Sequence, residues 1–176
     1  KYAADEACNL LYKCTGKKPD ISECIQSKQT GVFIGSAADV NKPSGPEDIL
    51  IDIKEDKICL TGGGPRGILY SVYEFFKRYL GVRFLTREHT YIPTEFPEKL
   101  PCESYTYSPP FSFRWSYYFA NSADPAFAAR LNINTVIEDE KLGGSTPQRL
   151  IGHSFGQQLP VLKYGKEHPE YFAIDR

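Results

Sequence analysis

The sequence predicts an α+β fold in which two helices cover one face of a mostly antiparallel sheet. Two stretches carry this prediction. Asp48–Ile53 and Lys57–Thr61 contain alternating apolar residues and are joined only by Lys54-Glu55-Asp56, which is a hairpin connection and makes the two strands antiparallel. The stretch Thr61–Leu85 then leads from a strand through an amphipathic helix into another strand.

Two shorter elements are expected ahead of this hairpin. Apolar residues recur at helical spacing from Ala3 to Cys14, and Gly16 followed by Pro19 ends that helix. Gly31–Gly35 has the composition of a short buried strand. The order helix, strand, hairpin, helix and strand favours a layer of helices on one side of a sheet.

The helix of the central stretch has both of its ends encoded in the sequence. Pro65 suits the first helical turn, where a missing N–H costs nothing, and Gly81 stands where a left-handed C-terminal residue belongs. A strand over Val82–Leu85 is expected to follow. The apolar face of the helix consists of Leu69, Val72, Tyr73, Phe76 and Leu80.

The glycine run before this helix, residues 62–67, matches the G-x-G-x-x-G pattern of dinucleotide-binding proteins, and Glu88 follows roughly twenty residues later. A dinucleotide-binding fold needs a parallel first strand with a helical crossover, whereas here a hairpin delivers the chain into the turn. Pro65 also removes an N–H that a pyrophosphate would use, and Arg66 places a bulky side chain in the tight turn. Nucleotide binding is therefore the least favoured hypothesis for this chain.

The second half of the chain begins with a proline-rich segment over residues 94–110, which predicts a strap between two bodies. Beyond it, residues 111–116 alternate between aromatic and polar side chains, which predicts a strand with one apolar face. A helix over Ala123–Leu131 and a strand over Ile133–Ile137 are expected next.

Strand, helix and strand at this spacing are typical of the start of a (β/α) barrel, and Asp124-Pro125 supplies the helix start. The residues after Pro110 are far fewer than the roughly 250 of a complete barrel. We therefore expect an α+β accessory domain over residues 1–93, the strap over residues 94–110, and the truncated beginning of a TIM-type barrel over residues 111–176.

Composition excludes several classes of partner. The 176 residues include 21 Lys+Arg against 22 Asp+Glu without a basic run, so no nucleic-acid partner is expected. No apolar run is long enough to span a membrane. The five cysteines show no C-x-x-C spacing, which argues against a zinc site and against a thiol redox motif, while one or two disulfides stay open. We expect no metal and no cofactor. The sequence leaves the oligomeric state open.

Several motifs together are similar to a known arrangement. The most specific is Gly62–Phe84, with the pattern G-x-x-RG-x-LY-x-x-YEF followed by LGVRF. The others are the helix at residues 4–16, Phe113-Arg114, Phe127–Asn134, Gly152–Phe155 and His168–Phe172. These motifs resemble the N-terminal domain of α-glucuronidases and family 20 β-N-acetylhexosaminidases, as found in large bacterial glycoside hydrolases. Departures are Ser71 where the family has glycine, and Ser122 where hexosaminidases have a second arginine.

The resemblance implies a small α+β domain that precedes a catalytic TIM barrel. It implies cleavage of glycosidic bonds in an oligo- or polysaccharide by an acid pair that lies beyond Arg176, and export to the periplasm or the outside of the cell. Glu138, Asp139 and Glu140 are the densest acids of this chain, but three adjacent charges are typical of a solvated face. No catalytic residue is therefore assigned here.

Two residues are candidates for substrate binding. Arg114 alternates with Phe113 and Trp115, so it is expected to point into the mouth of the barrel, where a guanidinium can hold a carboxylate or sugar hydroxyls. The alternative for Arg114 is a structural ion pair. His153 lies in a Gly-His-Ser-Phe-Gly loop, where an imidazole can donate to and accept from sugar hydroxyls, with a satisfied loop histidine as the alternative.

His168 and Glu170 flank Pro169, which favours a turn with a carboxylate at a helix start. The rival to a glycoside hydrolase is a non-catalytic carbohydrate-binding or interaction module. Its stacking platform would consist of Trp115, Tyr117, Tyr118 and Phe119.

Overall fold

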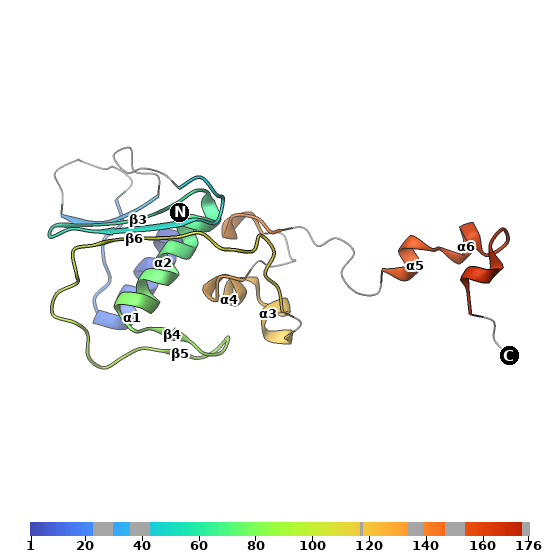
Figure 1. The fold of residues 1–176 in the computed structure, drawn as a ribbon. Coiled ribbons are helices and arrows are strands. Elements are labelled where there is room, and N and C mark those ends of the chain that lie inside the picture. Colours follow the sequence, from blue (N-terminus) through green and yellow to red (C-terminus); the bar gives the residue numbers. More distant parts are fainter. Residues whose placement is uncertain (23–29, 36–42, 117, 134–138, 147–153, 174–176) are drawn as a thin grey trace. The chain divides into compact units, whose positions relative to one another are not determined.

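The computed structural model describes residues 1–22, 30–35, 43–116, 118–133, 139–146 and 154–173 (Figure 1). These residues fall into two compact units, Lys1–Thr146 and Pro147–Arg176. The N-terminal unit is mixed α+β, as the sequence predicts. Within the described ranges, no helix combines the length and the apolar character that crossing a membrane requires.

The N-terminal unit is built on a four-stranded sheet in the order β1-β3-β2-β6. The strands are β1 (Gly31–Ile34), β2 (Ile49–Ile53), β3 (Lys57–Gly62) and β6 (Ser104–Tyr107). β2 pairs antiparallel with both β3 and β6, and only the pairing of β1 with β3 is parallel. The predicted hairpin and the mostly antiparallel sheet are thus confirmed.

Two helices lie on the same side of this sheet, as Figure 1 shows. α1 (Tyr2–Thr15) packs against α2 (Pro65–Tyr79), and α2 packs on β2 and β3. Gly16 and Gly81 follow the two helices with φ of +70° and +67°, a left-handed backbone that glycine adopts without strain. The shared core contains Ala7, Leu10, Ile49, Ile51, Ile53, Leu60, Leu69, Val72, Tyr73 and Phe76.

The glycine run joins β3 to α2 by close backbone packing. A Cβ on Gly62, Gly63 or Gly67 would overlap backbone atoms, mainly those of the loop at residues 43–48. The Gly63 N–H donates to Asp48 O at 3.1 Å and the Gly67 N–H donates to Pro46 O at 3.2 Å. Donors that a phosphate would need are therefore already used, and the loop covers the glycines. The run holds the loop in place.

The strand at Val82–Leu85 forms, but outside the four-stranded sheet. It is β4 (Arg83–Phe84), which pairs antiparallel with β5 (Thr90–Tyr91). The fourth strand of the main sheet is instead β6, inside the proline-rich residues 94–110. Prolines stand on both sides of β6 but not within it, so each of its residues can pair with β2.

The prediction of a strand over residues 111–116 is wrong, because this segment does not form a strand. An apolar and polar alternation becomes a strand only where a partner strand accepts its backbone hydrogen bonds, and the structure gives this segment none. The predicted helix is confirmed as α4 (Pro125–Arg130), whose N-cap Asp124 accepts from the Phe127 N–H at 3.0 Å. The expected strand Ile133–Ile137 lies almost wholly outside the described residues.

Residues 111–146 belong to the same compact unit as the sheet. α3 (Phe119–Ala123) precedes α4, and a short 3-10 turn, η1 (Glu140–Leu142), follows it. Both α4 and η1 pack against α2. The opening of a barrel that the sequence predicts is not confirmed.

The C-terminal unit consists of short helical turns. They are α5 (Phe155–Gln158), α6 (Val161–Tyr164) and η2 (Pro169–Tyr171). None of its described side chains is buried, and Leu162 is fully exposed. Glu170 lies in the first turn of η2 and its carboxylate is 3.0 Å from His168 Nδ1, as expected for a turn with a carboxylate at a helix start.

Candidate functional site

The N-terminal unit contains a buried carboxylate that is bound by two arginines. Glu47 lies in the loop that the glycine run holds, two residues before the first residue of β2, and its side chain is 7% exposed. Its Oε1 is 2.9 Å from Arg66 NH1, and its Oε2 is 2.6 Å from Arg114 NH2. Both oxygens of Glu47 are thus engaged by guanidinium groups.

Arg114 connects three separate segments through hydrogen bonds. Besides Glu47, it donates from Nε to Asn132 O at 3.0 Å and from NH1 to Phe111 O at 2.6 Å. Arg114 therefore makes a structural ion pair, the alternative to its predicted role in substrate binding, and this ion pair lies within the α+β unit. The other candidate, His153, lies outside the described residues.

A hollow of about 330 Å³ opens beside this cluster, between α2 and the edge strand β6. Tyr105 and Tyr107 line it from β6, and Tyr70 and Glu74 line it from α2. Since residues two apart on a strand share a face, the two β6 tyrosines both point toward the helix side. Arg114 and Asn132 complete the polar part of the wall.

Burial raises the pKa values of Tyr70 and Tyr105, two of the tyrosines that line this hollow. It raises the pKa of Tyr70 to about 12, and the negative charge of Glu47 adds to the effect. The pKa of Tyr105 is also raised, first by burial and then by the charge of Glu74. Both phenols are therefore protonated at neutral pH, and the Tyr70 hydroxyl donates to Ile133 O at 3.4 Å.

The remaining charges around the hollow are paired. Glu74 forms an ion pair with Lys77 at 2.9 Å on the surface of α2. The guanidinium of Arg78 lies 4.0 Å from the centre of the Tyr105 ring, as in a cation–π contact. Asn132 has φ of +57° and its Oδ1 is buried without a hydrogen-bond partner among the described residues.

A second buried carboxylate, Glu6, is not among the residues that line the hollow between α2 and β6. It accepts from the Tyr73 hydroxyl at 2.7 Å and from Arg130 Nε at 3.1 Å, and so joins α1, α2 and α4. Burial and the charge of Glu6 raise the pKa of Tyr73 above its ordinary value. This cluster has the geometry of a packing joint.

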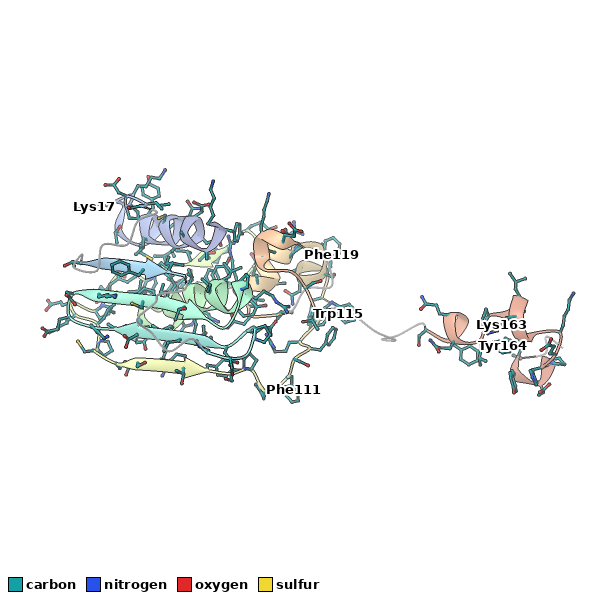
Figure 2. All side chains as sticks on the ribbon, turned by 90° about the horizontal axis from the view of Figure 1, so that it is seen from above. Lys17, Phe111, Trp115, Phe119, Lys163 and Tyr164 are labelled. Atoms are coloured by element: carbon teal, nitrogen blue, oxygen red, sulfur yellow. The ribbon has the colours of Figure 1, made fainter. Side chains whose placement is uncertain are left out.

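An exposed aromatic surface is the third feature. Phe111, Tyr118 and Phe119 are 69%, 80% and 76% exposed, whereas Trp115 is partly buried with its ring against Phe113. Figure 2 shows Phe111, Trp115 and Phe119 gathered at the same end of the N-terminal unit. Tyr117, the fourth member of the expected platform, lies outside the described residues.

The predicted acids and thiols do not form a reactive cluster in the part of the chain that the structure describes. Asp139 caps η1 by accepting from the Lys141 N–H at 2.9 Å, and Glu138 lies outside the described residues. No group of three His, Cys, Asp or Glu side chains in the described ranges is placed to hold a metal ion. Cys8, Cys14 and Cys102 are free thiols, and Cys59 is buried.

Sequence reasoning missed Glu47 and both tyrosines of β6. The one available signal for Glu47 was an acidic residue placed just before a run of buried isoleucines, which is common in loops. Tyr105 and Tyr107 were hidden in a segment that its prolines marked as a strap.

Comparisons with protein-family models, curated proteins and solved structures find no match for this chain.

Proposed function

We propose that this chain is the N-terminal part of a glycoside hydrolase that acts on complex carbohydrate. In this proposal the α+β unit is an accessory domain that supports the catalytic barrel, and the protein is exported. The motifs around Gly62–Phe84 support the family, and two helices on a mostly antiparallel sheet are the architecture expected of its accessory domain.

The proposal that the α+β domain supports the barrel rests mainly on the Glu47 cluster, which consists of Glu47, Arg66 and Arg114. Arg114, which follows the proline-rich segment, is bound to Glu47 of the α+β layer at 2.6 Å. Arg66 binds the same carboxylate and also donates to Thr146 Oγ1 at 3.0 Å. Buried charged bonds of this kind fix the geometry of the segments that they join. The domain thereby fixes the positions of Arg114 and Thr146 on the α+β layer.

The catalytic acids are proposed to lie beyond Arg176. Glycoside hydrolysis needs two carboxyl groups across the scissile bond, roughly 5–9.5 Å apart, with one acting as a proton donor. The carboxylates at the hollow are occupied, because Glu47 binds two arginines and Glu74 binds Lys77. The 1–176 chain is therefore expected to be inactive by itself.

Turnover of a panel of aryl glycosides tests this proposal. The native gene product, purified from its source, should release the aryl group from at least one glycoside, and the 1–176 chain should release none. Turnover by the 1–176 chain alone would contradict the placement of the acids. A native gene product without activity on any glycoside or polysaccharide would overturn the proposed function.

A non-catalytic carbohydrate-binding or interaction module is the second candidate, and the exposure of Phe111, Tyr118 and Phe119 favours it. Aromatic rings in solvent can stack on sugar rings. A glycan array with the 1–176 chain separates the candidates, because only the module should hold a glycan tightly without a barrel. Thermal stabilisation by NAD or ATP would instead support nucleotide binding, and we expect none.

A further inference from the structure

We infer that the hollow between α2 and β6 is a binding site for a single neutral sugar ring. This inference rests on the proposed function, but it concerns a place on the accessory domain that is separate from the proposed catalytic acids.

Size limits the ligand. At about 330 Å³ the hollow is at the lower end of the range of small-molecule sites, which run from roughly 300 to 1,000 Å³. It opens beside β6, the last strand of the sheet, so a ligand can reach it from the sheet edge. A hollow of this size fits one ring, with any further sugars of a chain in solvent.

The wall offers both kinds of contact that a sugar ring makes. Tyr70, Tyr105 and Tyr107 each present an apolar ring and a hydroxyl group. Sugar rings have apolar C–H faces and a polar edge of hydroxyls, so a tyrosine-lined wall can serve both. Burial raises the pKa values of Tyr70 and Tyr105, so both phenols stay protonated at neutral pH. The Tyr70 hydroxyl already donates to Ile133 O at 3.4 Å, so Tyr105 is the better placed donor for a sugar hydroxyl.

Charge balance favours a neutral ligand. Glu47 already binds two arginines, Arg114 donates to three acceptors, and Glu74 binds Lys77. An ionic ligand would have to displace one of these partners, whereas a hydroxyl needs only a donor or an acceptor. Asn132 Oδ1, which has no hydrogen-bond partner among the described residues, is one acceptor that a sugar hydroxyl could satisfy after a small movement.

Saturation-transfer NMR on the 1–176 chain tests the inference with glucose, galactose and N-acetylglucosamine as probes. Glucuronate and glucosamine serve as charged comparators. At least one neutral sugar should bind with a dissociation constant on the order of millimolar, because a ring-sized ligand makes few contacts. Tyr107→Ala should weaken binding by about tenfold or more, as expected for the loss of a stacking ring.

Tyr91→Ala is the matched control, because Tyr91 is also a half-exposed tyrosine on a strand but does not line the hollow. It should leave binding unchanged. Tyr107→Phe keeps the ring and removes the hydroxyl, so it should weaken binding less than Tyr107→Ala and covers the case in which the alanine variant does not fold. Circular dichroism checks the fold of each variant.

Two outcomes would overturn the inference. One is that no neutral sugar binds, and the other is that binding survives in folded Tyr107→Ala or Tyr107→Phe unchanged. If Phe119→Ser rather than Tyr107→Ala abolishes binding, the exposed aromatic surface is the sugar site. None of these results tests the proposed function, which the glycoside assay tests separately. A negative glycoside assay, in turn, would not contradict a sugar site that depends on Tyr107.

Discussion

Two buried carboxylates organise the N-terminal unit, and they differ in what surrounds them. Glu6 and Glu47 are 7% and 6% exposed, and each binds arginine from a distant part of the chain. Glu6 lies on α1, against a tyrosine of α2 and Arg130 of α4. Glu47 lies in a loop, has two arginine partners and borders a hollow.

The difference shows how the same chemistry serves two purposes. Glu6, the Tyr73 hydroxyl and the Arg130 guanidinium all belong to packed helices, so their bonds only join these helices. At Glu47 the partners come from a helix start and an extended segment, and the space between helix and sheet edge stays open. A buried ion pair alone is thus weak support for function, whereas one that borders a tyrosine-lined hollow is a candidate site.

Removal of Glu6 should have the largest effect on stability. Glu6→Ala leaves the wholly buried Tyr73 hydroxyl and the Arg130 guanidinium without their acceptor, so we expect a loss of about 4 kcal/mol in the free energy of unfolding. Urea denaturation measures it. Asp5→Ala, at an exposed position on the same helix, is the control and should cost less than about 1 kcal/mol. A loss no larger than that of the control would contradict a packing role for Glu6.

Glu47→Ala should cost somewhat less, about 3 kcal/mol, because the side chains of Arg66 and Arg114 are 14% and 20% exposed and keep part of their hydration. This variant should also weaken the sugar binding proposed above, whereas Glu6→Gln should not if it folds. Glu55→Ala, with a side chain that is 83% exposed, is the matched control and should change stability by less than about 0.5 kcal/mol. Equal sugar binding by Glu47→Ala and the wild type would remove the distinction between the two carboxylates.

Gly63→Ala tests how Glu47 is held. The new Cβ would overlap the backbone of Gly45, so the loop at residues 43–48 must move, and we expect a loss of about 2 kcal/mol. Because the loop carries Glu47, the damage should reach the hollow and leave the Glu6 cluster intact. Gly156→Ala is the control, since a Cβ there meets nothing within 4 Å, and it should leave the main unfolding transition unchanged. An unfolding curve of Gly63→Ala that matches the wild type would show that the loop at residues 43–48 moves to accommodate the new Cβ without loss of stability.

Local signals predicted the parts of this fold that local interactions determine. The three-residue hairpin connection, the glycines after α1 and α2, and the Asp124 N-cap each depend on neighbours in sequence, and each is confirmed. β6 was missed because its partner β2 is far away in the sequence and because its polar, proline-flanked residues carry no apolar period. Nearby residues say nothing about such a pairing.

The candidate site was predictable only in part. The alternation of residues 111–116 suggested that Arg114 lies on a barrel strand, whereas its guanidinium is fixed by Glu47, Phe111 and Asn132. A single charge has no periodicity, so the meeting of Glu47 with two arginines follows from the tertiary structure alone. The same holds for the hollow, which needs β6 at the sheet edge before it exists.

The tyrosines beside the two carboxylates offer the smallest and most local test. Tyr70 borders the Glu47 cluster and Tyr73 binds Glu6, one helical turn apart on α2. Burial raises the pKa of Tyr70 from 10.0 to about 12. Because the pKa of Tyr70 is higher in the folded state than in the unfolded chain, the protonated phenol contributes to the free energy of unfolding. This contribution is fully present below pH 10 and is lost as pH rises through about 12.

At about pH 11 the contribution of Tyr70 to the free energy of unfolding should have fallen by about 1 kcal/mol. Tyr70→Phe has no phenol to ionise, so its stability should fall that much less than the wild type between about pH 8 and pH 11, as urea denaturation at both values would show. Tyr118→Phe, at an exposed ring, should follow the wild type. Burial raises the pKa of Tyr73 in the same direction, so Tyr73→Phe should reduce the alkaline loss as well. If Tyr70→Phe loses as much stability as the wild type, the Tyr70 phenol is solvated, and the hollow is wetter than its wall of tyrosines indicates.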